Sequence, residues 1–293
     1  MSVSPPDMAV REELDREYSP SLCARDAAAT LARYAADSAE ARRGLDCRPD
    51  IPYGPSPDER LHLFPPPRPD APLLVFVHGG HWQESSKEDA CFAAPAMVEA
   101  GAGYVALGYG LAPRRRLGEM VASVRRGLHW VREHAAEFGG CADAVHVAGS
   151  SAGAHLAAMA IAEVRVLADP RPPAEVAGAY LLSGVYDLEP IRRCYVNDAL
   201  GLDDGAAADL SPVRWLPLRA GEVLVARGEA ETRAYARQHA LMVMALRAAG
   251  QRAADLVAPG RDHFELPLDL GVPGTPLGRE VLRRMGLHGR RGT

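Results

Sequence analysis

The sequence predicts an α/β fold with a mostly parallel central sheet and helices on both faces of the sheet. Short apolar runs, typical of strands buried on both faces, alternate along the chain with longer stretches of helical spacing. A Gly-x-Ser-x-Gly pentapeptide lies between one such run and one such helix. The length of 293 residues suits one domain. We therefore predict a single domain over 1–293, with an N-terminal helical segment at 1–45 and an insertion near the active site at 184–217.

The N-terminal part is predicted to contain a helix over 22–43, because this stretch is rich in alanine and its larger apolar residues recur near helical spacing. Residues 46–72 are rich in proline, and polar and apolar residues alternate at 61–64. This alternation predicts a short edge strand. We expect it to belong to the first hairpin of the sheet.

The rest of the chain is expected to alternate between strands and helices. Strands are predicted at 73–77, 104–107, 144–148, 176–183, 222–226 and 252–257. Helices are predicted at 117–138, after the pentapeptide, and at 234–249. In such an arrangement the ligand site lies at the carboxyl ends of the strands.

The pentapeptide Gly149–Gly153 indicates a nucleophile elbow, in which a sharp turn lifts the central serine above the edge of the sheet. Ser151 is therefore the candidate nucleophile. Glycine is needed on both sides of it because side chains there would collide with the neighbouring strand and helix. A chance match is the alternative in a chain with 28 glycines, and the strand and helix context favours the elbow.

A second motif, His-Gly-Gly-His-Trp at 78–82, directly follows the apolar run 73–77. Two glycines after a strand let the backbone turn its N–H groups toward one point, as an oxyanion hole requires. An ordinary Gly-Gly turn is the alternative. Beside the elbow we predict an oxyanion hole made by Gly79, Gly80 and His81, completed by Ala152 after the serine.

A carboxylate and a histidine complete the candidate site. Glu229 and Glu231 follow the run 222–226, and His263 lies in a loop after the last strand. The order serine, acid, histidine is that of the α/β-hydrolase fold, in which the imidazole accepts the serine proton and the carboxylate orients the imidazole. We assign the base to His263. Spacing does not separate the two glutamates, and Asp187 also follows a strand.

Composition excludes several other classes of function. A net charge of −5 gives no reason to expect nucleic acid or an anionic membrane as a partner. No apolar run approaches the roughly 20 residues of a membrane span, and the first residues carry acids and prolines where a secretory signal would be apolar. Five scattered cysteines indicate reduced thiols in a cytoplasm. His78 and His81 lack a third ligand at fitting spacing, so we expect no metal and no cofactor.

The motif at 78–82 matches the HGGxW motif of the arylformamidase, or kynurenine formamidase, family of α/β-hydrolases. The stretches SSAGAHLAAM, SGVYDLEPI and RDHFEL are similar to that family too, and the resemblance covers nearly the whole chain, from about Glu13 to Leu270. In the family the acid lies seven residues before the glutamine of an Arg-Gln pair. Here that pair ends at Gln238, so the resemblance implies Glu231 as the acid.

The resemblance implies hydrolysis of an aryl formamide, with N-formyl-L-kynurenine giving formate and L-kynurenine through a formyl-enzyme. Trp82 and Tyr186, which follow strands, could line an apolar bay for the aryl group, or could be core aromatics.

The chain departs from the family pattern at His62, at His239 and in having glutamate as the acid. The alternatives are a carboxylesterase on small or aryl esters, an amide hydrolase of secondary metabolism, and a binding module, which would usually lack a triad member. The expected partners are a small-molecule substrate and a second copy of the chain in a homodimer.

Overall fold

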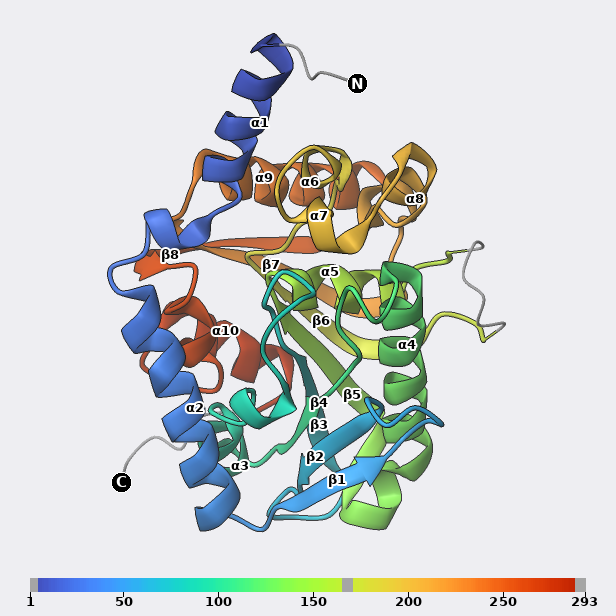
Figure 1. Ribbon diagram of the computed structural model, residues 1–293. Helices are drawn as coiled ribbons and strands as arrows, with labels where there is room; N and C mark the ends of the chain where they lie inside the picture. Colours follow the sequence, from blue (N-terminus) through green and yellow to red (C-terminus); the bar gives the residue numbers. More distant parts are fainter. Residues whose placement is uncertain (1–4, 165–170, 288–293) are drawn as a thin grey trace.

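The computed structural model of the chain describes residues 5–164 and 171–287, so both ends of the predicted 1–293 domain lie outside it. Eight strands form one sheet in the order β1-β2-β4-β3-β5-β6-β7-β8 (Figure 1). β1, β2 and β4 pair antiparallel, and every other pair is parallel. This arrangement confirms the predicted α/β-hydrolase fold.

The strand predictions are confirmed with small shifts at the ends. The strands are β1 (Arg48–Pro52), β2 (Arg60–Phe64), β3 (Ala71–Val77), β4 (Gly103–Leu107), β5 (Gly140–Ser150), β6 (Val176–Leu182), β7 (Ala220–Ala230) and β8 (Ala253–Asp262). β1 and β2 form the expected hairpin. β1 rather than β2 is the edge strand, because β2 also pairs with β4.

The helices cover both faces of the sheet. They are α1 (Pro5–Glu17), α2 (Ala27–Gly44), α3 (Ala94–Ala100), α4 (Leu117–His134), α5 (Ala152–Ala160), α6 (Glu189–Arg192), α7 (Asn197–Leu200), α8 (Asp204–Asp209), α9 (Arg233–Ala248) and α10 (Pro276–Arg284). The helix predicted over 22–43 begins later, because the Asp26 side chain accepts a hydrogen bond from the Ala29 N–H at 2.9 Å and caps α2. Among the described residues, no helix has the length and apolarity to cross a membrane.

β3 shows how the two faces arise from alternation. Leu73, Val75 and Val77 belong to the apolar cluster that includes residues of α4, α5 and α9. Leu74 and Phe76 belong to the opposite cluster, with residues of α2, α3 and α10. A strand that is buried on both faces must therefore be apolar at every position, as this run is.

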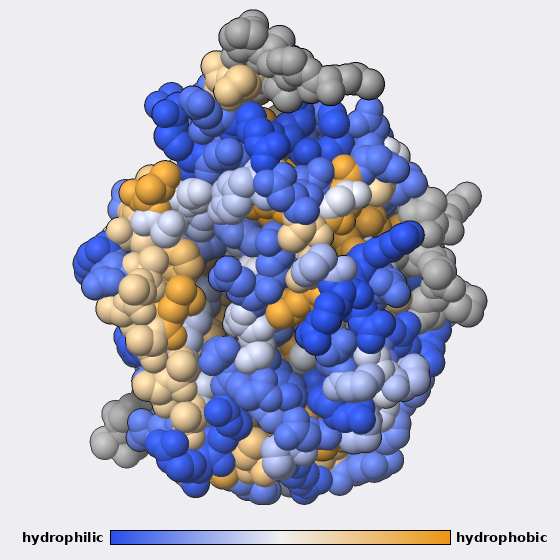
Figure 2. Space-filling view, viewed as in Figure 1, coloured by the Kyte–Doolittle hydropathy of each residue, from blue (hydrophilic) through white to orange (hydrophobic). Residues whose placement is uncertain are grey.

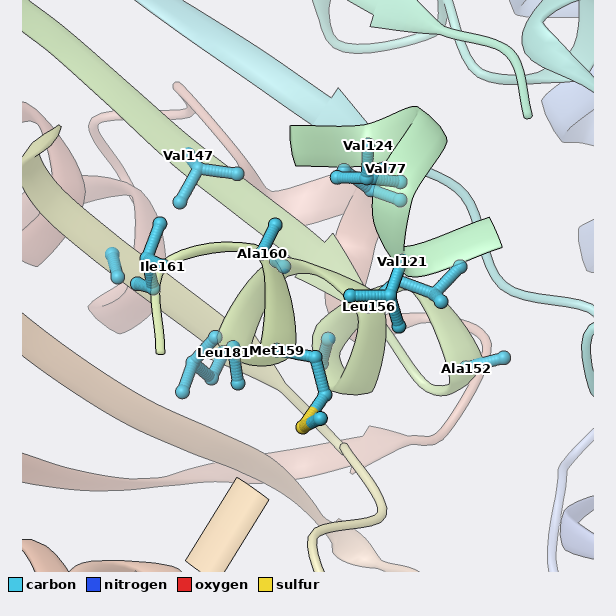
Figure 3. Close-up of a cluster of buried hydrophobic side chains, with 14 of the residues drawn as sticks. Val77, Val121, Val124, Val147, Ala152, Leu156, Met159, Ala160, Ile161 and Leu181 are labelled. Carbon is cyan, nitrogen blue, oxygen red and sulfur yellow. The ribbon is translucent and has the colours of Figure 1, made fainter. Parts of the chain in front are cut away.

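Helix α5, which follows the candidate nucleophile, packs on the sheet beside α4 (Figure 3). All nine of its residues are buried, and six of the nine are alanine or glycine. Figure 3 places Leu156 beside Val121 of α4, and Val147 comes from the sheet beneath. Small residues allow this close packing on both sides, which fixes the start of the helix and with it the elbow.

Candidate functional site

Ser151 occupies a strained turn between β5 and α5, with φ 55° and ψ −119°. Its backbone N–H donates to the Leu182 carbonyl at 2.8 Å, which ties the turn to the end of β6. A Cβ on Gly149 would overlap the backbone of Gly153, and a Cβ on Gly153 would overlap the Val77 carbonyl at the end of β3. Both glycines are therefore required by close backbone approach, as the sequence predicts.

The loop 78–82 lies against this elbow. Gly80, His81 and Trp82 have φ of 99°, 48° and 61°, so three successive residues are left-handed. The Gly80 carbonyl accepts hydrogen bonds from the N–H groups of Gln83 at 2.8 Å and Glu84 at 2.9 Å, which closes the turn. A Cβ on Gly79 would come within 3.2 Å of the Ser151 Cβ, so the first glycine lets the loop approach the elbow.

Glu231 and His263 form a buried pair. His263 Nδ1 lies 3.3 Å from Glu231 Oε2, and the side chains are 5% and 0% exposed respectively. The Ser183 hydroxyl and the Gly228 N–H each donate to Glu231 Oε1 at 2.6 Å. These donors hold the carboxylate in place, and the carboxylate in turn fixes the orientation of the imidazole.

Glu229, the rival acid, points elsewhere. It is exposed, and its Oε2 accepts a hydrogen bond from the Gly260 N–H at 2.9 Å. The pairing between β7 and β8 is irregular between Gly228 and Ala230. Glu231 follows this irregularity directly and turns inward to the His263 ring.

Ser151 and His263 line one pocket of about 540 Å³, together with Gly79, Gly80 and His81. Ala152 is buried behind it, at the start of α5, where an amide has no acceptor within the helix. No direct hydrogen bond joins the Ser151 hydroxyl to the His263 ring in the described part of the chain. Such bonds are often long until a substrate is bound.

One wall of the pocket is apolar and comes largely from residues that the sequence analysis does not single out. Tyr34 and Phe92 stack with ring centroids 4.5 Å apart. Leu31, at 46% exposure, lies at the rim, and Figure 2 shows apolar surface running along α2. The residues of this wall are Leu31, Tyr34, Phe76, Phe92 and Phe264.

Trp82 and Tyr186 do not line this pocket, which corrects the prediction that they contact the substrate. Both are fully buried in the core. The left-handed backbone at His81 and Trp82 turns the indole away from the pocket, where its Nε1 donates to His155 Nδ1 at 3.3 Å. The aromatic residues that do line the pocket wall include Tyr34 and Phe92.

Tyr235 of α9 is a further residue that the sequence analysis misses. Its hydroxyl lies 3.3 Å from His81 Nε2, and its ring meets the His263 ring edge-on at 4.5 Å. Burial raises the pKa of Tyr235, and the nearby Ser151 side chain partly offsets this rise. Burial, with a smaller effect of the His263 charge, lowers the pKa of His81 to about 4, so this ring is neutral at pH 7.

Helix α1 is bound to the segment that contains α6 and α7, and one residue of that segment lines the pocket. Arg11 of α1 donates from Nη2 to both carboxylate oxygens of Asp198 at 2.8 Å. The Tyr195 N–H donates to Asp15 at 2.7 Å, and Tyr195 lines the pocket. Gln238 of α9 contacts both of these segments. Its Nε2 donates to the Tyr18 hydroxyl at 2.9 Å. Its Oε1 accepts hydrogen bonds from the N–H groups of Tyr186 at 2.8 Å and Asp187 at 2.9 Å.

The departures at positions 62 and 239 lie outside the pocket. His62 of β2 accepts a hydrogen bond from the Asp50 N–H at 3.1 Å, and His239 donates to Asp255 at 2.7 Å. His62, Asp50 and Glu88 could offer atoms to a metal within 4.8 Å of one another. The Lys87 ammonium already contacts both carboxylates, lying 2.9 Å from Asp50 Oδ1, and supplies positive charge there.

Comparisons with known proteins agree with this fold. A family model described as BD-FAE matches residues 61–167. The chain is 33% identical to a kynurenine formamidase from Danio rerio over 94% of this chain and 97% of that one. It is 31% identical to esterase LipQ from Mycobacterium tuberculosis over 83% of this chain and 63% of that one. The crystal structure of a putative thioesterase from Silicibacter sp. TM1040 superposes with a TM-score of 0.80 at 28% identity, over 92% of this chain and 98% of that one.

Proposed function

This chain belongs to the kynurenine formamidase family of α/β-hydrolases, and from that premise we propose that it cleaves an aryl formamide, with N-formyl-L-kynurenine as substrate. The products are formate and L-kynurenine. The observation that carries the proposal is the buried Glu231–His263 pair, with Nδ1 and Oε2 3.3 Å apart, at a pocket that also contains Ser151 and the loop 78–82.

The first half of the reaction forms a formyl-enzyme. Ser151 Oγ attacks the formyl carbon while His263 Nε2 takes the hydroxyl proton, and Glu231 holds the imidazole through Nδ1. The oxyanion accepts hydrogen bonds from backbone N–H groups of the loop 79–81 and of Ala152. Each such donor typically contributes about 10²–10³ in rate. The C–N bond then breaks, and His263 returns the proton to the departing arylamine.

The second half is hydrolysis of the formyl ester. A water molecule gives a proton to His263 and attacks the formyl carbon, and the serine leaves with that proton as formate is released. A formyl group has no side chain and needs little space beside the serine. The aryl leaving group needs an apolar surface, and the wall of Tyr34, Phe92 and Leu31 supports this assignment.

A carboxylesterase is the second candidate, and the 31% identity to an esterase from Mycobacterium tuberculosis favours keeping it. The same serine, imidazole and oxyanion donors act on esters and on activated amides. A kinetic comparison of N-formyl-L-kynurenine with p-nitrophenyl acetate separates the two. We expect the higher kcat/KM for the formamide, and a higher value for the ester would overturn the first candidate.

The identity of the nucleophile is tested separately. Ser151→Ala should lower kcat by about 10⁴-fold or more while the protein stays folded. A fluorophosphonate should label the native protein and not this variant. The exposed pocket serine Ser21 gives the matched control, since Ser21→Ala should keep its labelling. Near-native turnover by Ser151→Ala would show that another residue attacks the substrate.

A further inference from the structure

The charged residues that line the pocket are all of one sign. Glu84 and Asp89 are the acidic residues among them, and none of the described lining residues is a lysine or an arginine. Glu84 is exposed and Asp89 is half-buried. Within residues 5–164 and 171–287 neither carboxylate forms an ion pair, and Asp89 accepts one hydrogen bond, from the Ser86 hydroxyl at 2.9 Å.

Basic side chains close to the lining residues are bound elsewhere, and Arg42 of α2, for example, donates to the Glu88 carbonyl. Lys87 lies two residues before Asp89 in the chain. Its ammonium group contacts Asp50 and Glu88, which do not line the pocket. Arg25, near the N-terminal wall, lies 3.5 Å from Glu265. Among the described residues, neither Lys87 nor Arg25 pairs with Glu84 or Asp89.

The pocket histidines at 78 and 81 do not supply positive charge either. Burial lowers the pKa of each to about 4, so both are neutral at pH 7. The charge of Asp89 acts on His78, and the charge of Glu84 adds to the rise that burial causes in the pKa of Tyr195. The charges of these two carboxylates therefore act on other residues that line the pocket.

The side-chain amide of Gln83, which lines the pocket, is also occupied. The Gln83 Nε2 group donates to the carbonyls of His81 at 3.2 Å and Val196 at 3.0 Å. A substrate carboxylate that entered the pocket would be repelled by Glu84 and Asp89 and would find no lysine or arginine among the described lining residues. Its loss of hydration would therefore cost free energy that no ion pair offsets. An ammonium group would find two unpaired carboxylates in a partly desolvated site.

We propose that this pocket recognises a cationic amine on the leaving group of its substrate, through Glu84 and Asp89, and provides no counter-ion for a carboxylate. The inference rests on the proposed function and narrows it. Its substrate class is an aryl formamide, or aryl ester, whose leaving group carries an ammonium group. With N-formyl-L-kynurenine the α-ammonium faces these two residues and the α-carboxylate points to solvent.

Matched substrates test this charge preference. N-formylkynurenamine keeps the ammonium of the parent compound and lacks its carboxylate, and 4-(2-formamidophenyl)-4-oxobutanoate keeps the carboxylate and lacks the ammonium. We expect kcat/KM for the amine to exceed that for the acid by about tenfold or more, and the ratio to fall as salt is added. An acid that is cleaved as fast as the amine would overturn the proposal.

Variants connect the preference to the two residues. The double variant Glu84→Gln with Asp89→Asn should bring the amine-to-acid ratio close to one. Glu99→Gln removes an exposed carboxylate outside the pocket lining and should leave the ratio as it is in the native protein. A ratio that is unchanged in the double variant would show that other groups set the preference.

Two further measurements separate this proposal from the proposed function. If the formamides are not cleaved, the acetate esters of tyramine and of 3-(4-hydroxyphenyl)propanoate give the same comparison for an esterase. A preference for the tyramine ester would support the charge inference and reject the formamidase assignment. Calorimetric binding of the amine and the acid to Ser151→Ala gives the comparison without turnover, and equal or tighter binding of the acid would refute the charge inference.

Discussion

The Trp82 indole N–H donates a hydrogen bond to His155 Nδ1 at 3.3 Å, and the two rings meet edge-on at 5.2 Å. Because Nδ1 accepts this bond, the ring proton is on Nε2, which donates to the Leu210 carbonyl at 2.7 Å. Burial lowers the pKa of His155 to about 4, so the ring is neutral at pH 7. The chain of bonds joins the loop 78–82 to α5 and to the insertion.

Trp82→Phe should lower kcat by about tenfold and stability by about 1 kcal/mol, because it leaves a buried acceptor on His155 without its donor. KM should change little, since the indole does not line the pocket. Steady-state kinetics and urea unfolding measure the two effects. Trp130→Phe, on a partly buried tryptophan of α4, is the control and should keep native kcat. Native kcat in Trp82→Phe would show that the loop holds its shape without this bond.

Glu231→Gln should lower kcat by about 10⁴-fold, because the amide no longer holds the imidazole in the required tautomer. Glu229→Gln should change kcat by less than about threefold, since this side chain bonds Gly260 and is exposed. Both variants are compared by kinetics, with circular dichroism to confirm folding. A larger loss in Glu229→Gln would reverse the assignment of the acid.

Tyr235→Phe should lower kcat by about three- to tenfold while KM stays similar, because its hydroxyl bonds His81 Nε2 and holds that residue beside Ser151. Tyr53→Phe is the matched control. It also removes a buried hydroxyl, which bonds the Gly108 carbonyl away from the pocket. The control should lose stability and keep kcat. Equal kcat in both variants would assign Tyr235 to packing alone.

Stability should fall as the pH is lowered through the range from about 6.5 to about 4. Burial lowers the pKa of His78, His81, His146 and His155 to about 4 in the folded chain. The folded state then binds fewer protons than the unfolded state in this range, so stability is complete above about 6.5 and is lost below it. Each histidine contributes on the order of 1.4 kcal/mol per pH unit at most.

Urea unfolding at about pH 7.5 and about pH 5 measures this dependence. His146→Asn is the test variant, because His146 lies on β5 outside the pocket and its Nδ1 accepts a hydrogen bond from the Tyr180 hydroxyl at 2.9 Å. The variant should have a shallower dependence on pH than the native protein. Equal stability at both pH values would contradict the burial of neutral histidines.

Much of the fold can be predicted from local patterns. Continuous apolar runs identify strands buried on both faces, as in β3, and paired glycines mark the turns where Gly149 and Gly153 meet neighbouring backbone. The walls of the pocket cannot be predicted in this way. They depend on contacts between distant segments, such as Arg11 with Asp198, and no local pattern announces such a pair.

Side-chain direction after a strand is also hidden from the sequence. Trp82 follows β3 closely, yet the left-handed backbone at 80–82 turns it into the core. Glu229 and Glu231 are two residues apart, so both would point to the same face of a regular strand. The pairing near Gly228 is irregular, and only Glu231 points toward His263. The resemblance of the Arg-Gln pair to a known family, rather than spacing, points to Glu231.

Gly153 of the elbow lies against the Val77 carbonyl at the end of β3, and the glycine loop 78–82 begins at the same strand end. Neither part can be adjusted by substitution without displacing the other. Directed evolution of this enzyme toward new substrates should therefore leave positions 77–82 and 149–153 fixed. Useful variation would come from the outer walls, where Leu31, Glu84 and Tyr195 can be randomised while the bond-breaking machinery is preserved.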